Sequence, residues 1–389
     1  MSSPFQRYRR RTIVAGAAVA GLLIVGAPVT AFALTGTFSS TPANAHATAS
    51  GNSEGAPHWT ISKQVFKPAA TSAGQKADGA VAALPTYAYV AAAGGYEVVK
   101  VAVATDTIVG AISGADDTGE GVAVSPNGST LYIASTGQYS VLATNTTTDA
   151  QTSIFVGAYP QDVAVSPTGV LVYATVTGGD TGPGGSNQVA VINTATNAVT
   201  SDITVGTAPR QVVFSPDGSR AYVTSSGGVY VINTATSRVV RVIGGLDDPQ
   251  GIAISPDGST LYVTSPDAGL LWQINAVSGR VIGSVNAGEE PYSVTITPNG
   301  STVYVADENS NSVDVINAAT GRVTGSIAVQ GLPMSIAATP DGSQVWVGNG
   351  YTGSISVIST ATNTVTDTIS GGGQASALNS ALTAIAFGS

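Results

Sequence analysis

The chain has 389 residues, of which 43% are hydrophobic and only 10% are charged, with 47 glycines and no cysteine. Its 14 Lys and Arg stand against 23 Asp and Glu, a formal net charge of −9. The lack of cysteine excludes disulfides, thiolate metal sites, a lipoprotein anchor, covalent haem attachment and cysteine nucleophiles. Low charge with many small and β-branched residues is typical of an all-β protein with many turns.

Residues 1–34 have the pattern of a targeting segment, which is kept apart from the fold. An uncharged run over residues 12–27 follows four arginines, Arg7, Arg9, Arg10 and Arg11. That run is shorter than the ~20 residues of a membrane span, but it reaches anchor length if it is continued to Leu34. We predict a cleaved signal peptide, cut after Ala33 or Ala45, with a retained signal-anchor as the alternative. Both place the protein outside the cytoplasm, either secreted or tethered to the outer face of the cytoplasmic membrane.

Residues 35–85 are rich in Ser, Thr, Ala, Gly and Pro and show no sustained periodicity, so we predict a flexible linker. Both histidines of the chain, His46 and His58, fall in this segment. Two histidines without further ligands make a poor metal site, so we expect them to be ordinary linker residues.

A repeated motif dominates residues 86–389. Six near-copies of Ser-Pro-Asp-Gly-Ser-Thr-Leu-Tyr-Val-Thr-Ser are spaced 41, 49, 40, 42 and 42 residues apart and begin at Ser125, Ser166, Ser215, Ser255, Thr297 and Thr339. Apolar residues alternate on both sides of the turn, as in Ile252 and Ile254 before it and Leu261 and Val263 after it, which indicates strands. Four such antiparallel strands in each 40–49-residue unit predict the blades of a β-propeller.

A second turn, between the third and fourth strands, occurs seven times. Its left-handed position is occupied by Asp106, Asp149, Asn197, Ser237, Gly279, Gly321 and Asn363, mostly residue types that tolerate that conformation. The additional unit, residues 87–112, lacks a first strand, and residues 383–389 match that strand. We therefore predict an all-β, seven-bladed propeller of four antiparallel strands per blade over residues 86–389. The C-terminal strand completes its first blade and leaves no open edge in the ring.

The repeats resemble the YVTN-type propeller repeats of bacterial and archaeal surface proteins. Tyr222-Val223-Thr224 and Tyr262-Val263-Thr264 carry the resemblance, although Ser225 and Ser265 replace the fourth-position Asn. The resemblance implies the propeller fold and a secreted or cell-surface location. It leaves function open, because such relatives include scaffolds, DNA-binding proteins, lactonases, lyases and quinoprotein subunits.

The composition of residues 86–389 restricts their chemistry. Seven Lys and Arg stand against 21 Asp and Glu, a formal charge of −14, so we expect no nucleic acid partner. Arg238, Arg241, Arg280 and Arg322 fall on predicted outermost strands, where charge discourages edge-to-edge aggregation. Residues 86–389 contain no His or Cys, so a Ser–His or Cys–His nucleophile and an imidazole general base are unavailable. We predict no catalytic or cofactor-binding residue.

Two classes of function remain. The first, which we favour from sequence, is a non-enzymatic scaffold that binds a protein or glycan at the cell surface through its rim loops. The second is an extracellular hydrolase of the propeller lactonase type that uses carboxylates or a metal. Contact with a membrane is expected only through an uncleaved N-terminal helix.

One face of the predicted ring is acidic. We predict a Ca²⁺ or Mg²⁺ site among its oxygen ligands, with ordinary solvated loop acids as the alternative. The candidate ligands are Asp116, Asp117, Glu120, Asp162, Asp247 and Asp248. Glu289 and Glu290 lie on the same face. Around the mouth of the central channel we expect Glu120, Gln161, Arg210, Gln250, Tyr292, Met334 and Thr383.

Overall fold

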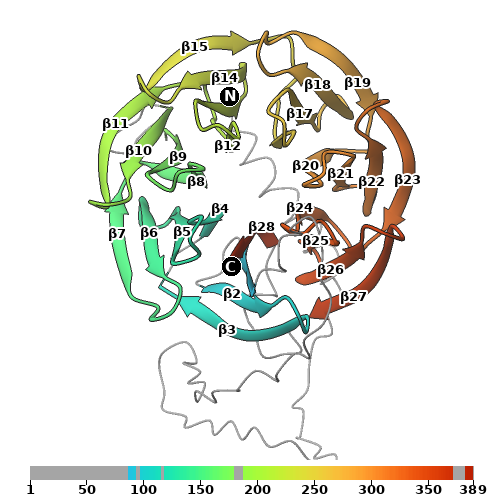
Figure 1. Ribbon diagram of the computed structural model, residues 1–389, viewed down its shortest axis with the longest axis horizontal. Helices are drawn as coiled ribbons and strands as arrows, with labels where there is room; N and C mark the ends of the chain where they lie inside the picture. Colours follow the sequence, from blue (N-terminus) through green and yellow to red (C-terminus); the bar gives the residue numbers. More distant parts are fainter. Residues whose placement is uncertain (1–85, 93–96, 115–117, 179–186, 371–381, 389) are drawn as a thin grey trace, which may run out of the picture. The chain divides into compact units, whose positions relative to one another are not determined.

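The computed structural model describes residues 86–92, 97–114, 118–178, 187–370 and 382–388. These residues form 28 strands arranged in seven four-stranded antiparallel sheets. The sheets stand side by side around a common centre, as the blades of a propeller (Figure 1). The predicted fold class and number of blades are therefore confirmed.

The predicted targeting segment and linker, residues 1–34 and 35–85, lie outside the described residues. Within the part of the chain that is described, no helix is long and apolar enough to cross a membrane.

Each blade runs from an innermost strand at the centre to an outermost strand at the circumference (Figure 1). From the first blade to the seventh, the innermost strands are β28 (Leu382–Gly388), β4 (Thr118–Val124), β8 (Tyr159–Val165), β12 (Val212–Phe214), β16 (Ile252–Ile254), β20 (Pro291–Ile296) and β24 (Pro333–Ala338). The second strands are β1 (Tyr87–Ala92), β5 (Thr130–Ser135), β9 (Leu171–Thr177), β13 (Arg220–Ser225), β17 (Thr260–Ser265), β21 (Thr302–Asp307) and β25 (Gln344–Asn349). The third strands are β2 (Glu97–Ala102), β6 (Ser140–Asn145), β10 (Gln188–Asn193), β14 (Gly228–Asn233), β18 (Leu270–Asn275), β22 (Ser312–Asn317) and β26 (Ser354–Ser359). The outermost strands are β3 (Thr107–Ser113), β7 (Gln151–Phe155), β11 (Ala198–Thr204), β15 (Arg238–Ile243), β19 (Val281–Asn286), β23 (Arg322–Ala328) and β27 (Thr364–Ser370).

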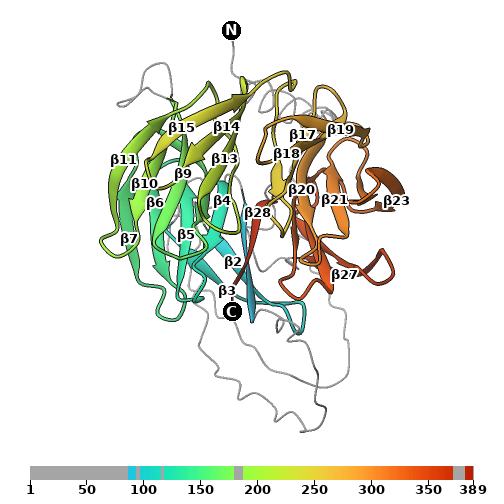
Figure 2. The same cartoon turned by 45° about the horizontal axis from the view of Figure 1, so that its top comes forward.

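The first blade joins the two ends of the propeller domain. Strand β28 pairs antiparallel with β1, with Ala88 opposite Phe387 and Val90 opposite Ile385. Figure 2 shows red β28 beside the blue strands of that blade. The seven innermost strands contact one another in the cyclic order β28, β4, β8, β12, β16, β20, β24 and back to β28. The predicted closure by the C-terminal strand is confirmed.

The hydrophobic core is divided among the junctions between blades. Seven buried clusters occur in the described residues, one between each pair of neighbouring blades. At the junction of the seventh and first blades, Trp346 is fully buried and meets Phe387 edge-on, with ring centroids 5.6 Å apart. Tyr222, Tyr262 and Tyr304 are also buried and recur at one repeat position, so we interpret them as packing residues of the architecture. Each blade therefore depends on both neighbours for its core.

The two kinds of turn have the predicted backbone geometry. The glycines of the Ser/Thr-Pro-X-Gly turns have φ of 71°, 72°, 68°, 71°, 71° and 73°, a conformation that glycine adopts without steric cost. All seven residues predicted for the left-handed position of the second turn have positive φ, between 49° and 70°, including Ser237. The repeat therefore preserves one turn geometry while the residue type varies.

Candidate functional site

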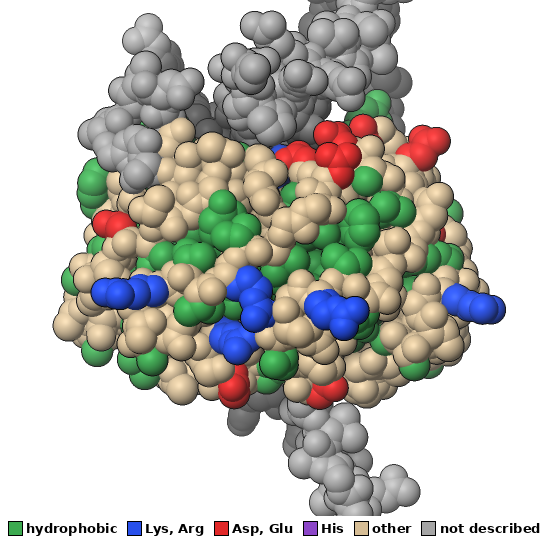
Figure 3. Space-filling view, turned by 90° about the horizontal axis from the view of Figure 1, so that it is seen from above, with side chains coloured by type: hydrophobic (Ala, Val, Ile, Leu, Met, Phe, Trp, Pro, Cys, Tyr) green, Lys and Arg blue, Asp and Glu red, His purple; other side chains and the backbone are tan. Residues whose placement is uncertain are grey.

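The ring has two chemically different faces. On one face, which we call the mouth face, the chain enters each innermost strand and also passes from the second to the third strand. The opposite face, the turn face, carries the Ser/Thr-Pro-X-Gly turns. Figure 3 shows Lys and Arg side chains in a row on the outer wall, with Asp and Glu toward its two edges. The described members of the predicted acids and channel residues lie on the mouth face.

The predicted channel residues occupy equivalent places at the beginning of the innermost strands. Arg210 and Gln250 come two residues before β12 and β16, and the others lie in β4, β8, β20, β24 and β28. Gln250 and Met334 are buried, and Gln161, Arg210 and Tyr292 are half-buried. The side chains of Glu120 and Thr383 are outside the described part.

Threonine hydroxyls on the second strands hold these channel residues in place across the blade junctions. The hydroxyl of Thr175 donates to the Arg210 carbonyl oxygen at 2.6 Å, and that of Thr224 to the Gln250 carbonyl at 2.8 Å. Thr264 donates to the Tyr292 carbonyl at 2.9 Å. Because each donor lies one blade before its acceptor, the backbone of the mouth is fixed by the ring itself.

Side chains near the mouth also bind backbone groups of the next blade. Asp162 accepts the Val212 N–H through Oδ2 at 2.9 Å, and Gln211 accepts the Ile252 N–H through Oε1 at 3.1 Å. Asp162 therefore has an architectural role beside the role as a metal ligand that its sequence suggests.

Arg210 and Asp248 form an ion pair at the mouth. The Arg210 Nη2 lies 2.6 Å from the Asp248 Oδ2, and the two side chains are 15% and 25% exposed. Asp248 has a positive φ of 41°, which turns the loop between β15 and β16. Sequence analysis predicts Arg210 at the channel mouth and Asp248 among the candidate metal ligands, and the structure pairs the two side chains. The pair presents a guanidinium and a carboxylate to solvent at one point.

Gln250 occupies the position in the fifth blade that Arg210 occupies in the fourth, two residues before the innermost strand. Its side chain is 3% exposed, and its Oε1 has no hydrogen-bond partner within the protein. A buried carbonyl oxygen without a partner costs free energy, so it is a place where a bound donor would be stabilising.

The predicted metal site is described only in part. Asp116 and Asp117, together with the Glu120 side chain, lie outside the described part. Asp247 is exposed and Asp248 is paired with Arg210. Among the residues that are described, no three Asp, Glu, His or Cys side chains are placed to hold a metal ion. The metal site stays a prediction.

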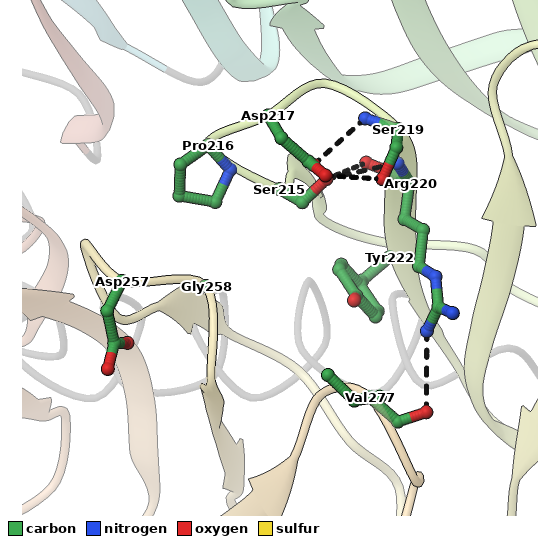
Figure 4. Close-up of a pocket in the computed structure, with 9 residues that line it drawn as sticks. All are labelled: Ser215, Pro216, Asp217, Ser219, Arg220, Tyr222, Asp257, Gly258 and Val277. Atoms are coloured by element: carbon green, nitrogen blue, oxygen red, sulfur yellow. Dashed lines mark hydrogen bonds between the residues drawn. The ribbon is translucent and has the colours of Figure 1, made fainter.

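A cavity of about 350 Å³ opens on the turn face between the fourth and fifth blades (Figure 4). Its polar groups already have partners in the protein: Asp217 accepts from Ser215 and Ser219, and Arg220 donates to the Val277 carbonyl at 3.4 Å. A second cavity of about 290 Å³ uses corresponding turn residues of the fifth and sixth blades. Because the cavity repeats with the blades, we interpret it as a feature of the architecture.

The sixth blade contains a pair of acids that sequence analysis missed. Asp307 is fully buried at the end of β21, and Asp314 on β22 is 8% exposed. The signal was present in the repeat, because the matching positions in the next blade are the neutral residues Asn349 and Ser356.

Comparisons with known proteins agree with the fold. The model of one family, described as Lactonase, 7-bladed beta-propeller, matches residues 188–331, a range that includes Arg210, Asp248 and Gln250. No curated protein matches the chain. The family match does not test the resemblance to YVTN-type repeats, which remains an interpretation of the sequence.

Solved structures share the propeller architecture at low identity. A hydrazine synthase of Kuenenia stuttgartiensis is 20% identical, with a TM-score of 0.63 over 74% of this chain and 99% of its own. A functionally unknown protein of Desulfotomaculum acetoxidans is 15% identical, with a TM-score of 0.65 over 78% and 98%. The dihydro-heme d1 dehydrogenase NirN is 16% identical, with a TM-score of 0.58 over 73% of this chain and 63% of its own. At these identities the similar structures show the fold alone, so an activity must be argued from the residues of the site.

Proposed function

We propose that the ring is an extracellular hydrolase of the propeller lactonase type, with its site at the mouth face. The observation that carries the proposal is the family match over residues 188–331, which spans the Arg210–Asp248 pair and Gln250. This match favours the hydrolase over the non-enzymatic scaffold that sequence composition favoured.

The chemistry of Arg210 and Asp248 is suited to ester hydrolysis. When water attacks a lactone carbonyl, negative charge develops on the carbonyl oxygen, and fixed donors stabilise it. Arg210 has five N–H donors, and its bond to Asp248 uses one of them. The remaining donors are available to the oxyanion, while the Asp248 carboxylate orients the guanidinium and can accept a proton from the attacking water.

A panel of lactones of different ring size and hydroxylation tests this proposal. Proton release by the full-length secreted protein is followed in weakly buffered solution, with added Ca²⁺ or with chelator. We expect Arg210→Gln to reduce kcat/KM by about 10²–10³-fold, the usual effect of removing an oxyanion donor. Asp248→Asn should reduce kcat/KM and change its pH dependence.

Arg280→Gln is the matched control, because it removes an exposed arginine from the turn just before the outermost strand β19. Its activity should equal that of the unsubstituted protein. Absence of hydrolysis with every lactone, with and without divalent cations, would return the protein to the class of binding scaffolds.

The export of the protein is proposed from residues 1–34 alone. The N-terminal residue of the mature protein tests it. A start at Leu34 or at His46 in the medium supports cleavage and release, whereas a membrane-bound chain that begins near Met1 supports the anchor.

A further inference from the structure

The buried acids of the sixth blade lack the partners that buried carboxylates require. Asp307 has no exposed surface, and neither of its carboxylate oxygens has a hydrogen-bond partner. A buried, unpaired carboxylate is strongly disfavoured in its ionised form. Because no side chain donates a hydrogen bond to it, the negative charge of the Asp307 carboxylate must be removed in another way, such as by binding a proton.

The β-sheet register places a second acid beside it. Asp307 is opposite Ser312, and Asp314 is opposite Val305, so the two acids are diagonal neighbours on one face of the β21–β22 pair. Burial and the charge of Asp314 raise the pKa of Asp307 to about 9. The nearby Asp314 N–H lowers this pKa in part, although its geometry does not make it a hydrogen-bond partner of the carboxylate. Burial also raises the pKa of Asp314, while the Ser326 hydroxyl lowers it. Asp307 is thus the member that holds a proton at neutral pH.

The seventh blade shows how the same positions look when an amide donor is present. Asn349 occupies the place of Asp307, and Ser356 the place of Asp314. The Asn349 Nδ2 donates to the Ser356 Oγ at 3.0 Å and to the Ser354 carbonyl at 3.1 Å. In the sixth blade the Asp307 carboxylate replaces this amide donor. A hydrogen bond from Asp307 to the neighbouring strand β22 therefore requires that Asp307 carry a proton.

A short segment of the mouth face covers Asp307. Gly288, at φ +71°, approaches so closely that a Cβ there would lie 2.7 Å from the Asp307 Cγ. The next two residues bind the turn after β21, because Glu289 N–H donates to Ser310 Oγ at 2.9 Å and Glu308 N–H to the Glu290 carbonyl at 3.1 Å. The covering segment, residues 287–290, therefore seals Asp307 from water.

We propose that Asp307 and Asp314 form a proton-binding pair. The proton held by Asp307 keeps the covering segment closed, and loss of this proton at alkaline pH opens the segment. Once Asp307 loses its proton, two buried carboxylates face each other and require water. Glu289 and Glu290 on the covering segment and Glu308 on the adjoining turn add like charge, which favours opening further. The pair binds a proton, and no other ligand is required.

The sign of the pH effect follows from the raised pKa of Asp307. Its protonated form is the native form, so the native state is most favoured below the unfolded-state pKa of about 4 and loses stability as pH rises toward about 9. Between pH 5 and pH 9 we expect the Tm of the unsubstituted protein to fall by about 5 °C more than that of Asp307→Asn. The double variant Asp307→Asn with Asp314→Ser copies the seventh blade and should also lack this extra decline.

Asp267→Asn is the control, because it removes an exposed acid from the corresponding turn of the fifth blade. Its pH dependence should match that of the unsubstituted protein. At pH 7 the infrared band of a protonated carboxyl should be present in both and absent from Asp307→Asn. At pH 9 the amides of Glu308 and Asn309 should exchange faster in the unsubstituted protein than in Asp307→Asn.

Parallel Tm curves for the unsubstituted protein and Asp307→Asn would overturn the proposal, as would the absence of a protonated-carboxyl band. Elemental analysis of the unsubstituted protein and of Asp307→Asn tests whether a metal ion, rather than a proton, lies between the two acids. A stoichiometric metal ion that Asp307→Asn loses would overturn the proton assignment in favour of a metal cation between the two acids.

Discussion

At the scale of single residues, the surroundings of an aspartate decide whether its pKa is lowered or raised. Asp217, on a turn at the surface, accepts hydrogen bonds from Ser215 and Ser219, which lower its pKa to about 2. Asp307 has no such donors and is buried, so its pKa lies near 9. Hydrogen-bond donors, rather than residue type, decide whether an acid stabilises the ring as an anion or as a neutral group.

We expect Asp217→Ala to lower the free energy of unfolding by about 0.5–1.5 kcal/mol at pH 7, because the turn loses its acceptor. The depressed pKa of Asp217 makes this contribution complete above the unfolded-state pKa of about 4, and it is lost as pH falls toward 2. Urea unfolding at several pH values measures both effects. Asp217→Asn should be nearly neutral, since Asn127 and Asn299 accept the corresponding serine N–H at 3.1 and 2.9 Å. Equal losses for the Ala and Asn variants would contradict this explanation.

At the scale of strands and blades, the contacts that matter most cross from one blade to the next. The threonines of the second strands hold the carbonyl groups of the mouth, and the buried clusters lie between sheets. A blade by itself is a four-stranded sheet whose two apolar faces would be exposed to water, so its stability depends on packing against both neighbouring blades.

Thr224→Val tests one of these contacts. The Thr224 hydroxyl donates to the Gln250 carbonyl and accepts the Gln211 N–H, and both groups lose their partner in the variant. We expect a loss of about 1–3 kcal/mol, the cost of leaving buried polar groups unpaired. The control Thr324→Val removes an exposed hydroxyl of β23 that donates to the Val315 carbonyl of the same blade at 3.1 Å. Because this bond is near the surface and does not cross to another blade, we expect a loss of less than about 0.5 kcal/mol. Similar losses for the two variants in chemical denaturation would show that the inter-blade bond is unimportant.

Removal of residues 380–389 tests the closure of the ring. The deletion removes β28, exposes the edge of β1 and opens the core on both sides of the first blade. We expect a large fall in Tm, or failure to fold, together with aggregation through the exposed edge. Calorimetry and size-exclusion chromatography measure these effects. A truncated protein that melts within a few degrees of the intact one would contradict closure by β28.

At the scale of the whole molecule, the ring separates its charges. The domain is strongly acidic, and the described loops of the mouth face carry Asp247, Asp248, Glu289 and Glu290. Figure 3 shows Lys and Arg in a row on the outer wall, with Asp and Glu toward its two edges. An acidic mouth raises the local concentration of cations and repels anions. This field would act on any substrate or metal ion that approaches Arg210 and Asp248.

Calcium tests whether the acidic face binds a cation. We expect millimolar Ca²⁺ to raise the Tm, because a ligand that binds only the folded state stabilises it. The double variant Asp247→Asn, Asp248→Asn should reduce that shift, and Asp267→Asn should leave it unchanged. Identical melting temperatures with Ca²⁺ and with chelator would identify these acids as solvated loop residues.

The sequence alone determined the architecture, because the same local pattern of strands and turns recurs in every repeat. Strand alternation, the Ser/Thr-Pro-X-Gly turn and the second turn each predicted a local geometry, and even Ser237 has the expected positive φ. The match between residues 383–389 and the first strands predicted the closure that the β28–β1 pairing confirms. These features depend on neighbours in the chain or on equivalence between repeats, and both are visible in a sequence.

Only the tertiary structure decided how individual polar side chains are used. Arg210 and Asp248 are 38 residues apart, and Asp162 reaches Val212 across 50 residues, so neither contact could be inferred from local pattern. The burial of Asp307 depends on the covering segment at Gly288 and on the diagonal position of Asp314. Burial and charge proximity arise only when the blades pack together, and they turn an ordinary loop acid into an ion-pair partner, a backbone acceptor or a carrier of a proton.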